Sequence, residues 1–350
     1  MKYIDFGFIF LIIGAIIGAG FSSGKEIVVF FSGAGNYSYI LIIIIAFFLY
    51  LVLSSLIKLG QNIQPHNIKD INKTLFKKHS SFFDFFILVG LFIFITAMVA
   101  GLNSVGSLIF ENINFPILTI ISIFFAFFIV LNGYDAIKQV NNFLIPLVLI
   151  FIAFITIYSF FLPTNQSIKL QANFIIFLKY FSLGICYISY NIVFSTSLIV
   201  EKSKDFSKKK SKVNSIIISF ILGFLIFLIN LALLKGNYNN FYSDLPMLNI
   251  AFDIHGTVGY LFGFILWLSI LTSLISSLYM LVNAFKMNKY LSCAIFLTLS
   301  FILSFFGFSY IINFIYPIQG LIGLVFIFKT LTYNYKIKKI KKQTISDLKK

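Results

Sequence analysis

Charged residues, and the residues that form disulfides or metal sites, are scarce in this chain. Its 350 residues include only 11 acidic side chains, two cysteines and three histidines, and all 27 basic residues are lysines. Because 59% of the residues are hydrophobic and only 11% are charged, a water-soluble globular domain is excluded. Cys186 and Cys293 lie in apolar stretches, without a CxxC pair or a nearby histidine, so they indicate neither a disulfide nor a metal site.

Long apolar runs take the place of the missing charge. A helix needs about 20 apolar residues to cross about 30 Å of hydrocarbon. The sequence therefore predicts an all-α integral membrane protein of about ten transmembrane helices, forming one transmembrane domain over 1–329. The ten predicted spans are 5–31, 38–59, 82–109, 116–131, 140–160, 173–200, 213–234, 256–285, 290–307 and 309–329.

The lysines predict the orientation of these spans in a cell membrane. If both termini are cytoplasmic, only Lys25, Lys169, Lys179 and Lys235 fall within or outside the membrane. All other lysines then lie inside, as the positive-inside bias requires. The net charge of +16 is thus a topology signal, and no nucleic-acid partner is expected. The polar, lysine-rich residues 330–350 are predicted to form a weakly ordered cytoplasmic tail.

Two connections between spans carry helical patterns. Apolar residues recur at helical spacing among the lysines of 68–78, which predicts a basic amphipathic helix on the inner membrane face, with a solvated loop as the alternative. The run Ser243-Asp-Leu-Pro246 is a helix-start signal in the outer loop between spans seven and eight. We expect this loop to be an extracellular lid.

The first apolar span is interrupted between Gly14 and Glu26 by glycines, serines and two charges. Ser23-Gly-Lys-Glu26 has the spacing of a capping box, which predicts a helix start inside the span. Broken backbone at membrane depth leaves unpaired N–H and C=O groups, so the break predicts a binding site for a cation and a carboxylate. The alternative is that Gly14-x-x-x-Gly18 simply permits close helix packing.

A second interruption is predicted in the sixth span, where polar residues extend from Ser182 to Asn191 around Gly184. The two predicted breaks lie in the first and sixth spans, so each half contains five spans, and five is an odd number. The halves 5–160 and 173–329 would therefore form a 5+5 inverted repeat with helices 1 and 6 unwound. The alternative is that these polar side chains only form hydrogen bonds between helices.

The eighth span carries a stripe of hydroxyl groups. Ser269, Thr272, Ser273 and Ser276 are spaced to lie on one face of a helix. Neutral hydroxyl and carbonyl oxygens suit a hard cation such as Na⁺. In the alternative interpretation the hydroxyls bond back to their own helix.

With these segments, the chain resembles the amino acid–polyamine–organocation superfamily with the LeuT fold, and most closely the bacterial YkvI-type membrane proteins. The resemblance rests on Gly18-Ala-Gly20-Phe-Ser-Ser-Gly24-Lys-Glu26 and on Met98-Val-Ala-Gly101-Leu-Asn103-Ser-Val-Gly106 with Phe110-Glu111. In such carriers the first and sixth helices are unwound around the substrate, and a sodium site lies between the first and eighth helices.

The resemblance implies roles for residues of this chain. The implied sodium ligands are the carbonyls of Gly14, Ile17 and Ser269 and the hydroxyls of Thr272 and Ser273. The implied substrate-binding residues are Ile16, Ala19, Gly20, Phe21, Ser22, Ser182 and Gly184. The N–H groups of Ala19, Gly20 and Phe21 would meet the substrate carboxylate, and Ile16 and the carbonyls near Ser182 would face its amine. Structural or gating roles are expected for Ser23, Lys25, Glu26 and Asn103.

One departure from the resemblance concerns Lys25, which stands where a neutral polar or a different basic residue is expected. The fifth span, 140–160, lacks the lysine that replaces sodium in some relatives, which favours sodium as the coupling ion.

The leading hypothesis is a secondary active transporter, a cation-coupled symporter of a small amino acid-like solute that works by alternating access in a lipid bilayer. No cofactor other than Na⁺ is expected, and the sequence defines no oligomeric state. An intramembrane enzyme is disfavoured because no catalytic cluster falls within the spans. A solute sensor resembling a germinant receptor, on the same fold, is the remaining alternative.

Overall fold

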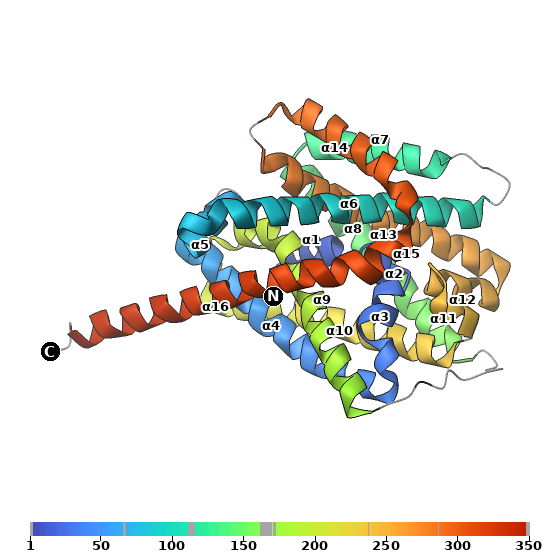
Figure 1. Ribbon diagram of the computed structural model, residues 1–350, viewed down its shortest axis with the longest axis horizontal. Helices are drawn as coiled ribbons and strands as arrows, with labels where there is room; N and C mark the ends of the chain where they lie inside the picture. The colour runs from blue at the N-terminus through green and yellow to red at the C-terminus, as the bar shows by residue number, and fades with distance from the viewer. Residues whose placement is uncertain are drawn as a thin grey trace.

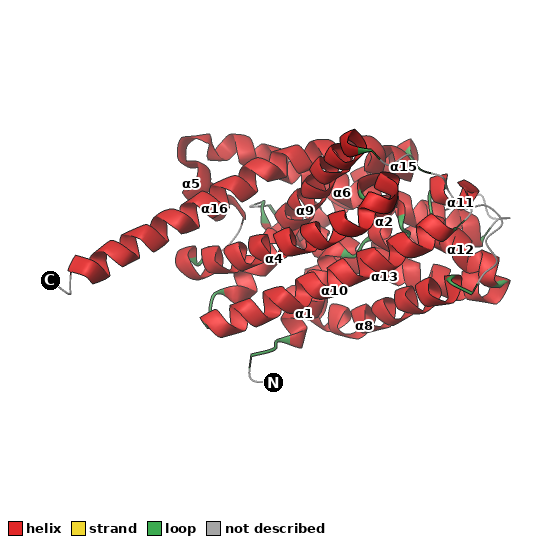
Figure 2. Ribbon diagram, turned by 90° about the horizontal axis from the view of Figure 1, so that it is seen from below, coloured by secondary structure: helices red, strands yellow, loops and turns green. Residues whose placement is uncertain are grey.

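The computed structural model describes residues 3–65, 68–110, 116–161, 170, 173–236, 238–285 and 287–347. The described residues are helical and contain no strand (Figure 2). The α-helices are α1 (Phe6–Ile16), α2 (Ala19–Ser22), α3 (Lys25–Phe30), α4 (Ser38–Ile63), α5 (Ile68–Phe76), α6 (Ser80–Ile109), α7 (Ile117–Leu131), α8 (Tyr134–Ser159), α9 (Phe174–Ser203), α10 (Lys208–Lys235), α11 (Tyr238–Tyr242), α12 (Pro246–Ile254), α13 (Gly256–Asn283), α14 (Lys289–Leu303), α15 (Phe308–Tyr310) and α16 (Tyr316–Asp347). Short 3₁₀ turns precede α4 and α6 and follow α14, and the π-helical turn η4 (Ile311–Ile315) joins α15 to α16.

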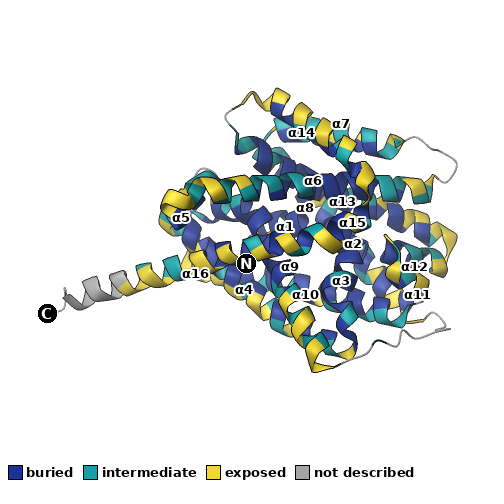
Figure 3. Ribbon diagram, in the orientation of Figure 1, coloured by how far each residue is buried: buried dark blue, intermediate teal, exposed yellow. Residues whose placement is uncertain are grey.

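The bundle has the surface of a membrane protein. Eight helices of the described chain are long and apolar enough to cross a membrane. The first predicted span is divided into α1, α2 and α3, and the fourth is the 15-residue helix α7. Large apolar side chains such as Phe128, Phe143 and Phe220 face outward, while the residues around α1 to α3 are buried (Figure 3). Because such a belt of apolar side chains is stable only against lipid, the predicted all-helical membrane fold is confirmed.

The sixth predicted span is not broken. Helix α9 runs without interruption from Phe174 to Ser203, so the prediction that helix 6 is unwound is wrong. Its polar side chains bond back to their own helix: Ser189 Oγ donates to the Ile185 carbonyl at 2.7 Å, and Asn191 Nδ2 donates to the Tyr187 carbonyl at 3.0 Å. These bonds satisfy the side chains without freeing any backbone group. The 5+5 inverted repeat stays a prediction.

The predicted amphipathic helix at 68–78 is confirmed as α5, but protein covers its apolar face. Ile68 and Ile71 are buried. The Phe76 ring stacks on Phe83 of α6 with a centroid distance of 3.6 Å and lies 6.3 Å from the ring of Phe326 in α16. Helix α5 is therefore anchored to the bundle through side-chain packing rather than through lipid contact.

The carboxyl-terminal segment continues α16. The helix extends through Asp347 and projects beyond the bundle (Figure 1), so the weak order predicted for this segment is wrong for residues 330–347. The stretch contains neither glycine nor proline, so nothing in it terminates the helix. Asn334 Nδ2 donates to the carbonyl and hydroxyl oxygens of Ser55 in α4, at 2.7 and 2.8 Å, which holds the base of this extension.

Asn103, for which a structural or gating role is expected, joins three elements of the bundle. Its Oδ1 accepts a hydrogen bond from Thr119 Oγ1 of α7 at 2.6 Å. Its Nδ2 donates to Ser304 Oγ, in the turn after α14, at 2.8 Å. One amide side chain of α6 thus connects two neighbouring segments.

We predict that Asn103→Ala destabilises the protein by about 1–2 kcal/mol, because the buried hydroxyl groups of Thr119 and Ser304 each lose a partner. Thermal unfolding of the detergent-solubilised protein measures this as a lower midpoint temperature. Ser107→Ala is the control, since Ser107 is exposed on the same helix and bonds only to the Ser104 carbonyl. Equal midpoints for Asn103→Ala and Ser107→Ala would contradict the bridging role.

Candidate substrate and cation site

The first membrane segment is broken between α1 and α2, as the sequence predicts. Ile17 leaves the helical conformation with φ −79° and ψ 82°. The Gly18 N–H donates to the Ile16 carbonyl at 2.9 Å instead of reaching the Gly14 carbonyl four residues back. The Gly14 carbonyl, at the centre of the protein, is therefore open to donors from other helices. All residues from 11 to 28 are buried.

A second turn, at Ser23 and Gly24, separates α2 from α3. Gly24 has φ +81°, in the left-handed region that favours glycine, and α3 starts at Lys25. The predicted helix start is thus confirmed, but its cap is Gly24 and the capping box does not form, because the Glu26 side chain turns towards Gly20. A Cβ atom on Gly20 would lie 2.3 Å from Glu26 Oε1, so only glycine allows this close approach.

Helix α13 supplies the opposite wall of the break. Ser273 Oγ donates to the carbonyls of Gly14 and Ile17 at 2.9 and 3.0 Å, and Ser269 Oγ donates to the Ile17 carbonyl at 3.0 Å. Thr272 Oγ1 donates to the Ser269 carbonyl at 2.8 Å. The three hydroxyl-bearing residues are fully buried. The structure therefore brings together the five residues predicted to hold sodium.

Helix α2 packs between α13 and α6. Ser22 Oγ lies within hydrogen-bond distance of Ser269 Oγ. The Ala19 N–H points to the sulfur of Met98 in α6 at 3.5 Å, a weak acceptor. A Cβ atom on Gly101 would lie 2.6 Å from Ala19 Cβ, so the second sequence motif of the resemblance packs directly against the break.

Sequence reasoning gave Met98 no role of its own at the break, because its spacing gives no sign of what it faces. Glu111, at the end of the same motif, lies outside the described residues.

The fourth hydroxyl of the stripe, Ser276, donates to the Thr272 carbonyl of its own helix at 2.8 Å, which is the alternative interpretation of that residue.

Two predicted substrate residues are not brought to the break. Ser182 is exposed, and its hydroxyl donates to the Lys179 carbonyl of its own helix at 2.7 Å. Gly184 faces α4, where a Cβ atom would meet Ile45 at 3.0 Å. Helix α9 instead presents Tyr187 and Tyr190, whose spacing of three residues is the signal that sequence analysis missed. Predicted residues Ile16, Ala19, Gly20, Phe21 and Ser22 are all buried at the break.

The loop that is predicted to be a lid contains α11 and α12 and is bonded to the broken segment. Helix α12 begins at Pro246, as expected, and the Met247 N–H donates to the Ser23 carbonyl at 2.8 Å. Lys25 Nζ donates to the carbonyls of Tyr242 and Ser243 at 3.3 and 2.8 Å. These bonds attach the segment of α11 and α12 to the turn between α2 and α3.

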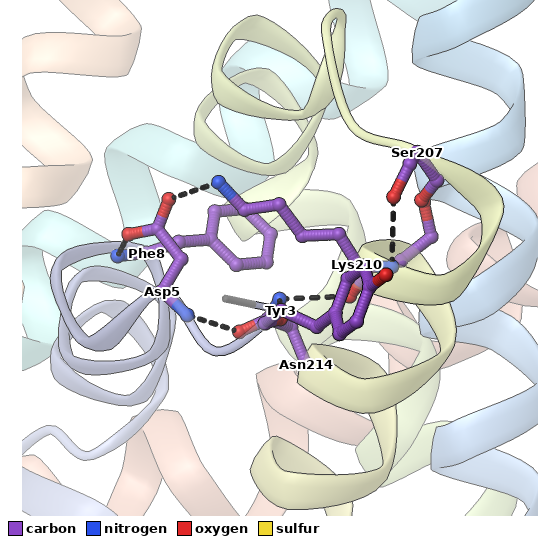
Figure 4. Close-up of polar contacts among 7 residues, drawn as sticks. Tyr3, Asp5, Phe8, Ser207, Lys210 and Asn214 are labelled. Atoms are coloured by element: carbon purple, nitrogen blue, oxygen red, sulfur yellow. Dashed lines mark hydrogen bonds and ion pairs between the residues drawn. The ribbon is translucent and has the colours of Figure 1, made fainter. Parts of the chain in front are cut away.

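A group of polar contacts at the start of α1, which we call the latch, joins this helix to α10 (Figure 4). Asp5 caps α1 by accepting from the Phe8 N–H at 3.0 Å, and it forms an ion pair with Lys210 of α10 at 2.8 Å. Asn214 Oδ1 accepts from the Asp5 N–H at 2.9 Å, and its Nδ2 donates to the Tyr3 carbonyl at 3.0 Å. The start of α1 is therefore held against the first turns of α10.

The charge of the latch is reflected in the pKa of Asp5. Partial burial raises the pKa of this carboxyl group, but the bond to Lys210, the Phe8 N–H and the lysine charges outweigh burial and hold the pKa below its ordinary value. Asp5 therefore favours its ionised form in the folded protein.

The described chain is a helical membrane protein whose first membrane segment is broken and packs on a hydroxyl-bearing helix. Comparison with known proteins confirms this fold. The chain is 25% identical to the uncharacterized membrane protein YkvI of Bacillus subtilis (strain 168) over 331 residues. This alignment covers 91% of this chain and 92% of YkvI. No protein-family model matches the chain.

The similar solved structures are LeuT-fold transporters. MhsT in complex with L-phenylalanine superposes with a TM-score of 0.70 at 15% identity, over 92% of this chain and 88% of MhsT. The manganese transporter of Eremococcus coleocola gives a TM-score of 0.65 at 15% identity, over 93% of this chain and 78% of the transporter. Mhp1, a nucleobase-cation-symport-1 family transporter, superposes with a TM-score of 0.56 at 12% identity, over 90% of this chain and 74% of Mhp1.

We predict that the Asp5–Lys210 latch depends on pH. Because the folded-state pKa of Asp5 is lowered, the latch stabilises the protein fully above the unfolded pKa of about 3.9 and is lost as pH falls through the folded value. Asp5→Asn keeps the helix cap but removes the charge. It should cost about 0.5–1 kcal/mol at pH 7.

Thermal unfolding from pH 3 to pH 7 tests this expectation. The gap between wild type and Asp5→Asn should stay constant down to about pH 4 and shrink below it. Lys210→Met should reproduce the loss at pH 7. A gap that is the same at every pH would show that the ion pair contributes nothing.

Proposed function

We propose that this protein is a sodium-coupled secondary transporter of a small amino acid-like solute in the cell membrane, with both termini in the cytoplasm. The carrying observation is the contact between the Gly14 and Ile17 carbonyls, freed by the break, and the hydroxyls of Ser269 and Ser273. A backbone break at membrane depth persists only where protein, water or a ligand satisfies its polar groups.

The arrangement of the two closures supports alternating access. The broken segment lies between the lid, bonded to Ser23 and Lys25, and the latch of Asp5 and Lys210. The lid is held by hydrogen bonds, and the latch is held by hydrogen bonds and one half-buried ion pair. The two are made by different ends of the same broken segment. Opening one closure while keeping the other would expose the break to one side only.

The oxygen atoms around the break suit sodium. The carbonyls of Gly14, Ile17 and Ser269 and the hydroxyls of Thr272 and Ser273 are neutral, hard donors, and a hydroxyl group can rotate its hydrogen away to accept a cation. A bound Na⁺ would offset the partial negative charge of these oxygens and hold α1 against α13.

The substrate class rests on the backbone donors and on the similar structures. The N–H groups of Ala19, Gly20 and Phe21, which follow the break, are proposed to meet a carboxylate. The similar transporter MhsT is described in complex with L-phenylalanine. Both points support an amino acid-like zwitterion for this chain.

We predict that the double variant Thr272→Ala and Ser273→Ala abolishes sodium stimulation of solute uptake, because two of the five proposed sodium ligands are removed. Uptake into proteoliposomes, with and without an inward sodium gradient, is the measurement, and the double variant should take up solute equally in both conditions. Ser219→Ala is the control, since this buried hydroxyl bonds to the Ser215 carbonyl within α10, away from the break.

Three results would count against the proposal. Unchanged sodium activation in the double variant would remove the site between α1 and α13. Wild-type uptake that needs no sodium gradient would remove sodium coupling. Solute binding without any uptake would identify a sensor on the same fold.

A further inference from the structure

Glu26 is a buried acidic residue without an opposite charge. It is 1% exposed, and the ion pair found among the described residues joins Lys210 to Asp5, at the other end of α1. The adjacent Lys25 turns away and donates to the carbonyls of the lid. An ionised carboxylate that is buried without a partner costs several kcal/mol, so such residues inside membrane segments usually mark a ligand or ion site.

Three buried tyrosines lie near this carboxyl group. Tyr187 and Tyr190 of α9 and Tyr316 of α16 all interact electrostatically with Glu26. The Tyr190 ring lies 4.8 Å from that of Tyr316 and 5.6 Å from that of Tyr187, measured between centroids. Phe30 of α3 packs on Tyr187 and Tyr190. We call Glu26, Tyr187, Tyr190 and Tyr316 the acidic tyrosine cluster.

Close helix packing places Tyr316 in this cluster. A Cβ atom on Gly320 would lie 2.4 Å from Cys186 Cβ, and one on Gly323 would lie 2.8 Å from the Ser189 backbone. The two glycines let α16 approach α9 closely, one turn and two turns beyond Tyr316. The cluster is therefore assembled from residues of three helices that are far apart in the sequence.

Four polar atoms of the acidic tyrosine cluster are unsatisfied. Glu26 Oε2 and the hydroxyls of all three tyrosines are buried and have no hydrogen-bond partner. Tyr190 lies close to the carboxyl group, but the geometry of its hydroxyl is not that of a hydrogen bond. Each buried polar group left in this state costs about 1–3 kcal/mol. Four such groups beside a broken helix are suited to binding a polar ligand.

The chemistry of the cluster selects that ligand. A primary ammonium group carries one positive charge and three N–H donors, so it can neutralise Glu26 and also serve the phenolic oxygens. The faces of tyrosine rings attract the same group through cation–π contact. A proton would remove the charge but supply only one donor, which leaves two hydroxyls unsatisfied.

The cluster also adjoins the proposed carboxylate contacts. The Glu26 carboxyl group lies directly over Gly20, as the 2.3 Å separation from a Cβ built there shows. We infer that Glu26, with the hydroxyls of Tyr187, Tyr190 and Tyr316, binds the ammonium group of the transported solute, which is therefore a primary amine. This inference rests on the proposed function, and it replaces the amine contacts predicted at Ile16 and near Ser182.

Ligand-induced thermal stabilisation of the purified protein in detergent tests the inference. The probes are the twenty standard amino acids, their decarboxylated amines and their deaminated acids, added at fixed pH and sodium concentration. Amine-bearing probes should stabilise the wild type, and the matched acids that lack the amine should not. For the probe that stabilises most, Glu26→Gln should weaken binding at least about 30-fold, because the amide removes the charge at nearly constant shape.

Two further variants make the result specific. Tyr190→Phe removes one hydroxyl and keeps the ring, so it should weaken binding about tenfold. Glu201→Gln removes an exposed carboxylate near the end of the same α9 and should bind like the wild type. Ligand-free Glu26→Gln should unfold at or above the wild-type temperature, since it no longer buries a charge, and this excludes misfolding as the cause of lost binding.

Three outcomes would overturn the inference. The first is that no amine-bearing probe stabilises the wild type, and the second is that the deaminated acids bind as well as the amines. The third is that Glu26→Gln binds amines like the wild type and alters only the pH dependence of uptake. This third result would make Glu26 a proton carrier. Failure of the transport proposal is distinct from these results. If the protein binds amines through Glu26 but transports nothing, the ammonium site stands and the transport proposal fails. If sodium drives uptake of a solute that has no amine, the transport proposal stands and the ammonium site fails.

Discussion

The structure depends on how the backbone groups at the break in the first membrane segment are satisfied. In hydrocarbon no water can pair with a free carbonyl, so the interruption at Ile17 and Gly18 requires donors from another helix. Ser269 and Ser273 of α13 provide them through contacts of 2.9–3.0 Å. This contact fixes α1 against α13 and makes the centre of the protein polar, while its outer surface stays apolar.

The same broken segment connects the centre to both ends of the bundle. Asp5 at the start of α1 joins α10, and Ser23 and Lys25 after α2 join the lid. A short segment with a break on each side of α2 can change its angle to the bundle without unfolding a long helix. The broken segment is therefore bonded to α13 at the break, to α10 through Asp5 and to the segment of α11 and α12 through Ser23 and Lys25.

Local sequence patterns predicted some of these features and misread others. The break in the first span and the hydroxyl-bearing face of the eighth span can both be derived from the sequence. Each depends on residues within one or two turns of helix, namely the glycines of 14–24 and the hydroxyl spacing from Ser269 to Ser273. The polar residues of α9 were misread because Ser189 and Asn191 have the same composition and spacing whether they free the backbone or bond to it. Only the observed bonds to the carbonyls of Ile185 and Tyr187 distinguish the two cases.

The sequence by itself determined that this is a helical membrane protein with an interrupted first span and a hydroxyl-bearing eighth span, because hydropathy and helical periodicity are properties of contiguous residues. The tertiary structure decided that Glu26 faces three tyrosines rather than capping its own helix. It also decided that Ser182 and Gly184 lie away from the break. Burial and pairing depend on which helices pack together, and residues far apart in the chain set that packing.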